Sequence, residues 1–505
     1  MKKILTLIFT AGLLLNVNTF FSQSKVEPGT NIIEFEEAEF HEKMLGSSGN
    51  FFYSLRMTTS GKGITYYVEK FNKSDRIKTL NFSIGKFSND KAIGGAYPVP
   101  KTKVLISCAF KNGILSVFSH RNEDYEQRQY LVDSYNLNDG QQIETERVLF
   151  SVPITKENFY KMAAMYSLSP DSSKMALLNA HENFTEGAAE NNLCLYDLVT
   201  KRMITTKKMS NLYQGKKICL NSFCVDNDAN LYYTFFQKGG VSFLSKYNAV
   251  SDKADVLTLK SNGITNVMKF DDKQNFLYIY AKNYTLQKAE NTFNYSISNL
   301  GFYSAKIDIK SFSLIGEKMN LFGQDIISKL ICNKSEGGVS IEGTLNFYDS
   351  GNDEYYVVWD NHSKYYAGEI IVTKLNSKFD ILWSKIIPRA ISPRVEIGVE
   401  DNSSSLSVYE NNKLNFLFLE HPKFELKNLD YTIVSNCETP LLRTFPNTNV
   451  VCYTIGSNGN IKKEILYLNE KEWLILDPQP IKTGGKYIIR FKKGKKENFG
   501  TLSVN

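Results

Sequence analysis

The chain contains little of the material from which common enzyme centres are built. It has 5 His, 3 Trp and 12 Pro among 505 residues, and the histidines are scattered. No H-E-x-x-H motif occurs, because the stretch that starts at His41 breaks off after Glu42. G-x-S-x-G elbows, phosphate-binding loops and dinucleotide fingerprints are missing as well. These absences argue against motif-bearing zinc peptidases, α/β-hydrolases and nucleotide-binding enzymes. The sequence predicts no catalytic residue, no metal ligand and no cofactor.

Long apolar runs are also missing after the N-terminus, where nothing approaches the roughly 18 residues of a membrane span. The N-terminus itself, "MKKILTLIFTAGLLLNVNTFFSQSK", places Lys2 and Lys3 before an apolar segment at 4–17 and a short polar exit. This is the layout of a secretory signal. The sequence predicts a signal peptide over 1–22, with a retained membrane anchor as the alternative. The mature chain, 23–505, is then exported to the periplasm, the cell surface or the medium, with no transmembrane segment of its own.

A strong charge imbalance is lacking. The formal net charge is +7, and removal of Lys2 and Lys3 with the signal leaves +5 (7 − 2). This mild excess does not indicate a nucleic-acid partner. What the chain does have is aromatic material for a core, with 33 Phe and 29 Tyr. Such side chains suit the half-buried surface of a β-sheet.

Cysteine is sparse and odd in number, at seven residues. Cys108, Cys194 and Cys452 lie inside apolar, strand-like runs, which predicts small buried side chains rather than reactive thiols. A disulfide between Cys219 and Cys224, or between Cys437 and Cys452, stays open from the sequence alone, since an exported protein meets oxidising conditions.

A repeated unit runs through the chain. In "YSLSPDSSKMALLNA", from Tyr166, a strand enters, turns on Ser, Pro and Asp, and returns, and "NNLCLYDLVTKRMITTKKM" adds a second hairpin. Turns on Asn, Asp, Ser and Gly have a mechanism, because these residues accept positive φ or bond their own backbone. The unit recurs roughly every 50 to 75 residues and supplies about four strands each time. Its copies begin at Phe51, Lys103, Tyr166, Ile218, Val267, Gly343 and Ser404.

Repeated four-stranded units predict an all-β fold, a single β-propeller with long rim loops. Seven blades are counted. The hairpin of the tail from Gly484 either closes the ring with the stretch 31–40 or belongs to an eighth blade, which is the alternative count. The competing architecture is two stacked β domains. Several long loops are predicted to project from the rims, and the clearest of them are 181–190 and 290–299.

One turn resembles a calcium loop at first sight. "DNDANL", from Asp226, alternates carboxylates with other residues, but it lacks Gly at the sixth place and has Gln237 where a calcium loop has Glu. The sequence therefore predicts a hairpin turn there.

Two resemblances rest on quoted stretches. "SPDSSK" followed by "LYDLVTKR" resembles the degenerate repeats of TolB-like and WD40-like propellers, which implies a fold and no catalytic residue. "FFSQ" resembles the signal ends of secreted proteins from Bacteroidetes-type bacteria. The segment from Phe347 onward, with "EIIVTKLNSKFDILWSKIIPR" and "NFLFLEHPKFELKN", is similar to uncharacterised secreted proteins of such bacteria. That likeness implies a location and a fold only.

These observations predict a non-catalytic binding or scaffold propeller of the bacterial envelope, with a protein or glycan partner held by rim loops. The stretch "WDNHSKYY" offers rigid aromatic side chains beside polar ones, a composition suited to interfaces. The alternative function is a carbohydrate-active hydrolase or lyase with acidic residues gathered in the central channel, so enzymatic activity is left open. The predicted binding residues are Trp359, Asp360, His362, Tyr365, Tyr366 and His421.

Overall fold

The structure, a computed structural model, describes most of the chain between Lys25 and Ser503. The described residues are 25–27, 29–35, 39–60, 63–88, 101–123, 126–154, 162–181, 192–208, 218–237, 241–261, 265–271, 273–288, 295–327, 344–362, 367–387, 406–420, 449–467, 474–475, 481–493 and 495–503.

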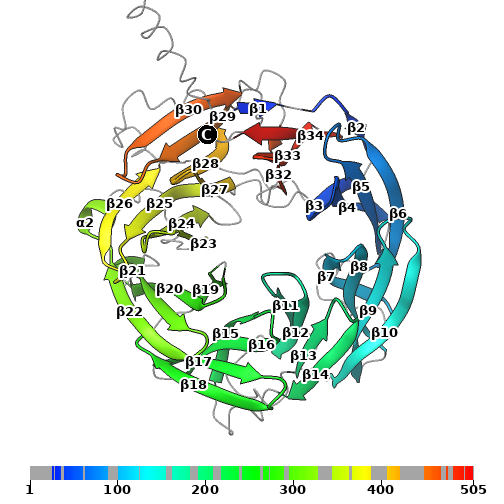
Figure 1. Cartoon of the computed structure of the whole chain (residues 1–505), viewed down its shortest axis with the longest axis horizontal. Helices are drawn as coiled ribbons and strands as arrows, with labels where there is room; N and C mark the ends of the chain where they lie inside the picture. The colour runs from blue at the N-terminus through cyan, green and yellow to red at the C-terminus, as the bar shows by residue number, and fades with distance from the viewer. Residues whose placement is uncertain are drawn as a thin grey trace, which may run out of the picture. The chain divides into compact units, whose positions relative to one another are not determined.

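The fold is all-β, a propeller of eight sheets, each built around four antiparallel strands. The chain divides into two compact units, which are described separately. The larger unit comprises Glu34–Ser404 and Leu426–Thr444, and the smaller one Met1–Ile33, Ser405–Glu425 and Phe445–Asn505. Within the larger unit the sheets follow one another in chain order, from blue to yellow in Figure 1.

The larger unit holds six four-stranded sheets, and in each the strands pair in chain order. The first three consist of β3 (Glu39–Ser48), β4 (Phe51–Ser60), β5 (Gly63–Asn72) and β6 (Lys78–Phe87); β7 (Lys103–Lys111), β8 (Ile114–Asn122), β9 (Gln127–Asn136) and β10 (Gln142–Pro153); and β11 (Met162–Leu168), β12 (Lys174–His181), β13 (Asn192–Asp197) and β14 (Arg202–Lys208). The next three consist of β15 (Ile218–Val225), β16 (Asn230–Gln237), β17 (Val241–Asn248) and β18 (Lys253–Leu259); β19 (Thr265–Phe270), β20 (Phe276–Lys288), β21 (Tyr295–Asp308) and β22 (Ser313–Leu321); and β23 (Thr344–Asp349), β24 (Tyr355–His362), β25 (Ala367–Leu375) and β26 (Ile381–Ile387). A short helix, α2 (Gln324–Ile327), precedes the sixth sheet.

The smaller unit holds the other two sheets. One consists of β27 (Leu406–Glu410), β28 (Lys413–Glu420), β29 (Asn449–Ile455) and β30 (Ile461–Tyr467). The last follows the path β1-β34-β33-β31, with β32 beside β33 and β2 beside β34. Its strands are β1 (Lys25–Glu27), β2 (Ile33–Glu34), β31 (Leu474–Ile475), β32 (Ile481–Thr483), β33 (Lys486–Lys493) and β34 (Lys496–Ser503).

The count of seven is wrong and the alternative of eight is confirmed. The tail hairpin β33–β34 forms a sheet of its own, which β1 completes by pairing Lys25 with Ser503. The first sheet also begins earlier than predicted, with β3 at Glu39. The sequence of β3, "EFHEKMLGSS", contains three charged residues, and its one pair of adjacent apolar residues is Met44 and Leu45.

Apolar runs inside the sheets are explained by burial on both faces. Along β24, Tyr355, Val357 and Trp359 belong to one core cluster, while Tyr356 and Val358, which point to the other face, are 1% and 0% exposed. A strand with two buried faces reads as a continuous apolar run rather than an alternating one. The sheets therefore pack face to face as propeller blades do.

In five sheets, the second to the sixth of the larger unit, the second hairpin turns on a recurring Asx motif. A side chain at or just after the end of the third strand accepts a hydrogen bond from a backbone N–H group two or three residues ahead, which closes the turn. These capping residues are Asn136, Asp197, Asn248, Asp308 and Asn376. The same turns end with a residue in the left-handed region, namely Gly140, Lys201, Asp252, Phe312 and Phe379. This shared turn is the clearest repeat signature of the chain.

The backbone of Lys201 is strained in that turn. Its φ is 55°, in the left-handed region that L-amino acids other than Asn and Asp rarely adopt. We expect Lys201→Gly to raise the free energy of unfolding by about 0.5–1 kcal/mol, since glycine adopts positive φ without steric cost. Denaturant unfolding measures the change. Thr200→Gly, one residue earlier in the same turn, is the matched control and should destabilise instead. A gain from both substitutions, or from neither, would contradict the strain argument.

The hairpin turn predicted at Asp226 is confirmed between β15 and β16. The Asp226 carboxylate accepts hydrogen bonds from the backbone N–H of Asp228 at 3.0 Å and of Asn230 at 2.8 Å. It also accepts from the Asn230 amide at 2.7 Å and from the Tyr232 hydroxyl at 3.1 Å. The Asp226 carboxylate thus stabilises the turn in which it lies.

The cysteine predictions are resolved in part. Cys194 and Cys452 are buried strand residues and Cys108 is half-buried, in line with the apolar runs around them. Burial raises the pKa of the Cys194 thiol to about 12 and that of Cys452 to about 11. Cys224 and Cys452 are free thiols, so neither of the two disulfides left open by the sequence forms.

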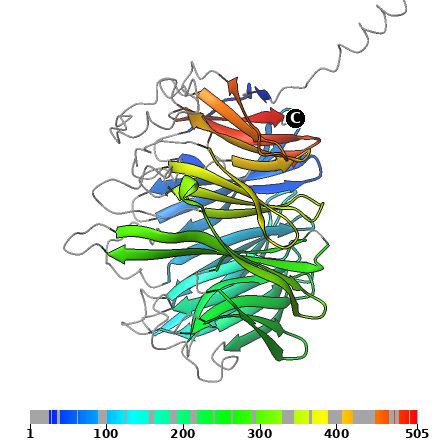
Figure 2. The same ribbon diagram turned by 90° about the vertical axis from the view of Figure 1, so that its left-hand side faces the viewer.

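One hairpin of the larger unit extends beyond its sheet. The pairing of β20 with β21 continues to Lys288 and Tyr295, whereas β19 pairs only as far as Ala281 and β22 only as far as Gly301. The green arrows of this hairpin project past neighbouring strands in Figure 2. The predicted loop at 290–299 is therefore partly strand, because its second half belongs to β21.

Apart from His181, the last residue of β12, the other predicted loop, 181–190, lies outside the described residues. No helix in the described ranges has the length and apolarity of a membrane span.

Candidate functional site

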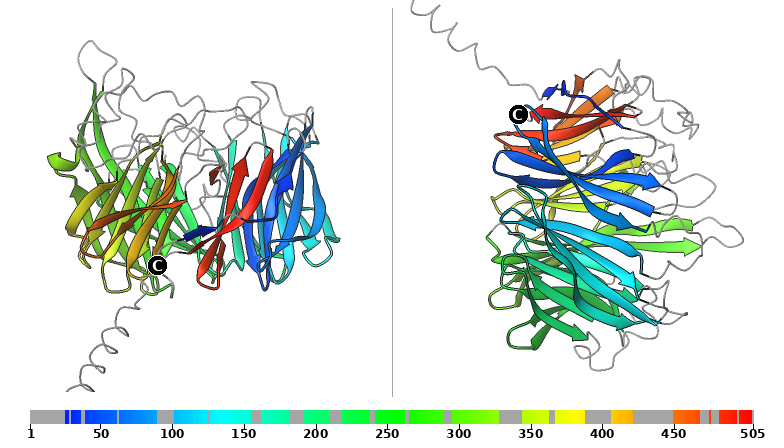
Figure 3. Two further views of the ribbon diagram at one scale, coloured as in Figure 1. Left: turned by 90° about the horizontal axis from the view of Figure 1, so that it is seen from above. Right: turned by 90° about the vertical axis from the view of Figure 1, so that its right-hand side faces the viewer.

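The two ends of each sheet in the larger unit differ. First-to-second and third-to-fourth strand connections are tight, as at 112–113, 226–229, 249–252 and 309–312. We call the end that carries them the turn-bearing end; it forms the lower edge of the sheets in the left view of Figure 3. The opposite, loop-bearing end carries the second-to-third strand connections and the connections between sheets, which include 88–102, 182–191, 209–217 and 322–343.

Neighbouring sheets are hydrogen-bonded to one another through their turn-bearing ends. The Asn227 side chain accepts from the backbone N–H of Asp171 at 3.1 Å, and the backbone N–H of Asn227 donates to the Gln274 side chain at 3.2 Å. Lysines on third strands add further links. The Lys70 amine donates to the carbonyl of Leu137 and the Lys246 amine to that of Ile309, both on the next sheet. These contacts at the turn-bearing end therefore hold neighbouring sheets together.

The loop-bearing end of the second and third sheets contains a buried polar cluster. His120 lies directly across from Tyr130, and Asn122 directly across from Arg128, on the β8–β9 hairpin. The Arg128 Nε–H donates to the Asn122 amide oxygen at 3.1 Å. The Tyr130 hydroxyl crosses to β12 and donates to the amide oxygen of Asn179. We call these five residues the polar cluster.

The polar cluster is nearly inaccessible. His120 is 6% exposed, Arg128 3%, and Tyr130 and Asn179 0%. The Tyr130 ring stacks on Phe150 at a centroid distance of 4.3 Å and lies 5.9 Å from the His120 ring. Burial raises the pKa of Tyr130 to about 12, so its hydroxyl stays protonated and donates. The cluster is thus a group of buried polar side chains packed among aromatic rings.

Burial, together with the positive charge of Arg128, lowers the pKa of His120 well below the ordinary value of 6.5. The folded protein therefore holds a neutral imidazole, whereas the unfolded chain takes up a proton below pH 6.5. Unfolding consequently binds a proton, and stability falls as the pH falls. We expect the free energy of unfolding to drop by about 1.4 kcal/mol per pH unit below pH 6.5, until the pKa of the folded state is reached.

Denaturant unfolding between pH 7.5 and pH 5 measures this slope. Wild type should take up one more proton on unfolding than His120→Gln does, because glutamine cannot titrate. Thr234→Val, a substitution at a fully buried site in the fourth sheet, should keep the wild-type slope. Equal slopes for wild type and His120→Gln would show that His120 titrates normally in the folded state.

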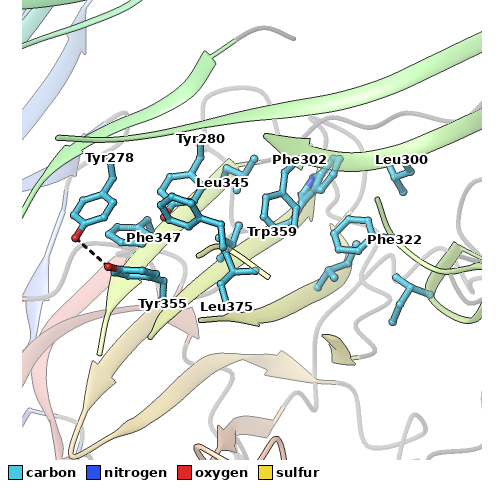
Figure 4. Close-up of a cluster of buried hydrophobic side chains, with 14 of the residues drawn as sticks. Tyr278, Tyr280, Leu300, Phe302, Phe322, Leu345, Phe347, Tyr355, Trp359 and Leu375 are labelled. Carbon is cyan, nitrogen blue, oxygen red and sulfur yellow. Dashed lines mark hydrogen bonds between the residues drawn. The ribbon is translucent and has the colours of Figure 1, made fainter. Parts of the chain in front are cut away.

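The predicted binding residues fall partly in the described structure. Trp359 and Asp360 lie near the loop-bearing end of β24 and are 2% and 3% exposed. The Lys282 amine lies over the Trp359 ring, 5.2 Å from its centroid, and Phe322 packs at 6.2 Å. Figure 4 shows Trp359 among the aromatic side chains of this core, next to Phe302. Trp359 thus anchors a core whose edge faces the loops, and its binding role stays a prediction.

The other predicted binding residues yield less. His362 ends β24 at the loop-bearing end, and only its backbone is described. Tyr365, Tyr366 and His421 lie outside the described residues. Their roles remain predictions.

Sequence reasoning missed the polar cluster. In the sequence His120 is one of five scattered histidines, and no motif marks Arg128 or Asn179. A usable signal exists, since His120 and Asn122 occupy the core-facing alternate positions of β8 that follow Phe118. Polar residues at the core-facing positions of a strand mark a buried polar group.

Among the described residues, no group of three or more His, Cys, Asp or Glu gathers in a way that could hold a metal ion.

No protein-family model and no curated protein matches the chain. Solved β-propellers do. The chain is similar to the C-terminal WD40 domain of Sif2 at 9% identity and a TM-score of 0.40, covering 96% of this chain and 99% of that one. It is similar to the Dos1 propeller at 8% identity and a TM-score of 0.44, covering 95% of each chain. It is also similar to TolB from Acinetobacter baumannii at 12% identity and a TM-score of 0.28, covering 67% of this chain and 80% of that one. At such identities the likeness concerns the fold alone.

Proposed function

We propose that the protein is an exported, non-catalytic binding scaffold of the bacterial envelope, and that it recognises a protein or glycan partner through the loop-bearing ends of its sheets. The observation that carries the proposal is the difference between the two ends. At the turn-bearing end the connections are short turns, and turns of neighbouring sheets are hydrogen-bonded to one another. Variable connections gather at the opposite end, and binding residues are disproportionately found on such loops over a rigid scaffold.

The envelope setting is supported by the N-terminal stretch with Lys2, Lys3 and the apolar segment at 4–17. The predicted binding residues follow the same polarity, because His362 ends its strand at the loop-bearing end and the stretch 363–366 connects β24 to β25. The proposal assigns partner contact to this end and structural support to the other.

Site-specific photocrosslinking tests the assignment. A benzoylphenylalanine residue is placed at one of three exposed positions of the loop-bearing end, Gln127, Lys208 or Leu321. The matched positions at the turn-bearing end are Asp139, Val250 and Lys310, also exposed. Each variant is irradiated in an envelope extract and in a glycan library bearing a detectable tag.

We expect a discrete adduct from the loop-bearing positions only. Adducts confined to the turn-bearing positions would overturn the assignment of the ends. Equal, diffuse labelling from all six positions would show that no specific partner is held. The purified wild-type protein is assayed in parallel for turnover of the same glycans, and catalytic turnover would replace the scaffold by an enzyme.

A further inference from the structure

The polar cluster contains two polar atoms without a protein partner. Within the described part of the chain, neither Nδ1 of His120 nor Nδ2 of Asn179 makes a hydrogen bond. Both side chains are more than nine-tenths buried, at 6% and 0% exposure. A buried polar atom without a partner destabilises the folded state, and a bound water or ion that completes the site removes that penalty.

Both atoms belong to side chains that adjoin Tyr130. The Asn179 amide accepts the Tyr130 hydroxyl through its oxygen, which leaves its NH₂ group beside that hydroxyl. The imidazole of His120 lies across from Tyr130 on the neighbouring strand, with ring centroids 5.9 Å apart. The two side chains that carry the unsatisfied groups therefore both adjoin one tyrosine, His120 from β8 and Asn179 from β12.

The chemistry of the surroundings selects the charge of an occupant. Asn179 offers an amino group, which only donates, and the positively charged Arg128 acts electrostatically on both His120 and Tyr130. Neutral His120 donates from Nδ1 in one of its two tautomers. Donors and positive charge stabilise an anion and repel a cation. Because the side chains around it are almost fully buried, the occupant has to be small.

We propose that a monovalent halide, chloride under ordinary conditions, binds beside Tyr130 and accepts hydrogen bonds from Nδ1–H of His120 and the Nδ2 amino group of Asn179. The ion connects β8 of the second sheet with β12 of the third at their loop-bearing ends. It stabilises the folded state by mass action, because the unfolded chain lacks the site.

Unfolding in sodium chloride and sodium bromide, each balanced with sodium gluconate to constant ionic strength, tests the site. Above the dissociation constant, a tenfold rise in halide is expected to raise the folded-to-unfolded ratio tenfold. Asn179→Leu removes the amino donor and should abolish the dependence. Thr234→Val, in the fourth sheet and remote in sequence from the cluster, should retain it. A wild-type protein that ignores halide, or an Asn179→Leu protein that keeps the full dependence, overturns the proposal.

Crystals of the wild type grown in bromide give a second readout that needs no variant. An anomalous difference peak is expected within hydrogen-bond distance of both nitrogen atoms. A water at that position, without anomalous signal, overturns the proposal even if Asn179→Leu fails to fold.

Discussion

Phe347→Ala is expected to lower the free energy of unfolding by about 4 kcal/mol, the typical loss when a buried Phe is truncated. Phe347 is 4% exposed on β23 and connects two sheets. Its ring lies 4.8 Å from those of Tyr278 and Tyr280 on β20, and 5.6 Å from that of Tyr355 on β24. Figure 4 shows the ring enclosed by these tyrosines. Truncation therefore leaves a cavity with aromatic walls on both sides.

Denaturant unfolding measures the loss, and two variants calibrate it. Phe347→Leu keeps most of the apolar volume and should cost a fraction of the alanine value. Val250→Ala removes methyl groups from a side chain that is 86% exposed, so its effect should stay within about 0.5 kcal/mol. If Phe347→Ala were no more destabilising than Val250→Ala, the packing of the fifth sheet on the sixth would be wrong.

Asp133→Ala is expected to cost about 3 kcal/mol, because removal of one member of a buried ion pair leaves the other uncompensated. Asp133, on β9, is 0% exposed. Its carboxylate lies 3.0 Å from the Lys103 amine, and it accepts the backbone N–H of Glu146 at 2.8 Å. Glu146 also approaches Lys103 at 3.3 Å, so the lysine keeps one partner and the loss stays at the lower end for buried pairs.

The matched variants separate charge from hydrogen bonding. Asp133→Asn keeps an acceptor for the Glu146 N–H and should lose less than Asp133→Ala. Lys462→Ala breaks an ion pair with Glu464 in which the lysine side chain is 71% exposed, and it should change stability several times less. A loss from Lys462→Ala as large as that from Asp133→Ala would mean that burial does not set the strength of these pairs.

The fold could be predicted from its turns and strands. Asn, Asp and Gly at regular places between aromatic-rich runs, as at Asn136 and Asp197, act through local backbone bonding that the sequence displays directly. The number of sheets could not be settled in the same way. β3 carries three charges, and the last sheet is completed by β1, from the opposite end of the chain. Such distant pairing has no local signal.

The strand pattern can mark His120 and Asn122 as buried polar residues, but the assembly of the polar cluster could not be predicted, because it depends on register. His120 and Tyr130 meet only through the pairing of β8 with β9, and Asn179 joins them only through the packing of two sheets. The predicted site around Trp359 had the opposite difficulty. Its local aromatic and polar composition is visible in the sequence, whereas the burial of the Trp359 side chain depends on Lys282 of β20 and on Phe322. Composition shows which side chains are available, and tertiary packing decides which of them face solvent.

Amide hydrogen exchange of the protein, with and without the partner captured by crosslinking, tests the central claim that one end of the sheets binds and the other supports. The account predicts new protection at the loop-bearing ends of β8, β14 and β22, with unchanged exchange in the turns at 198–201, 249–252 and 309–312. Protection centred on those turns, with unchanged exchange at the loop-bearing ends, would contradict it.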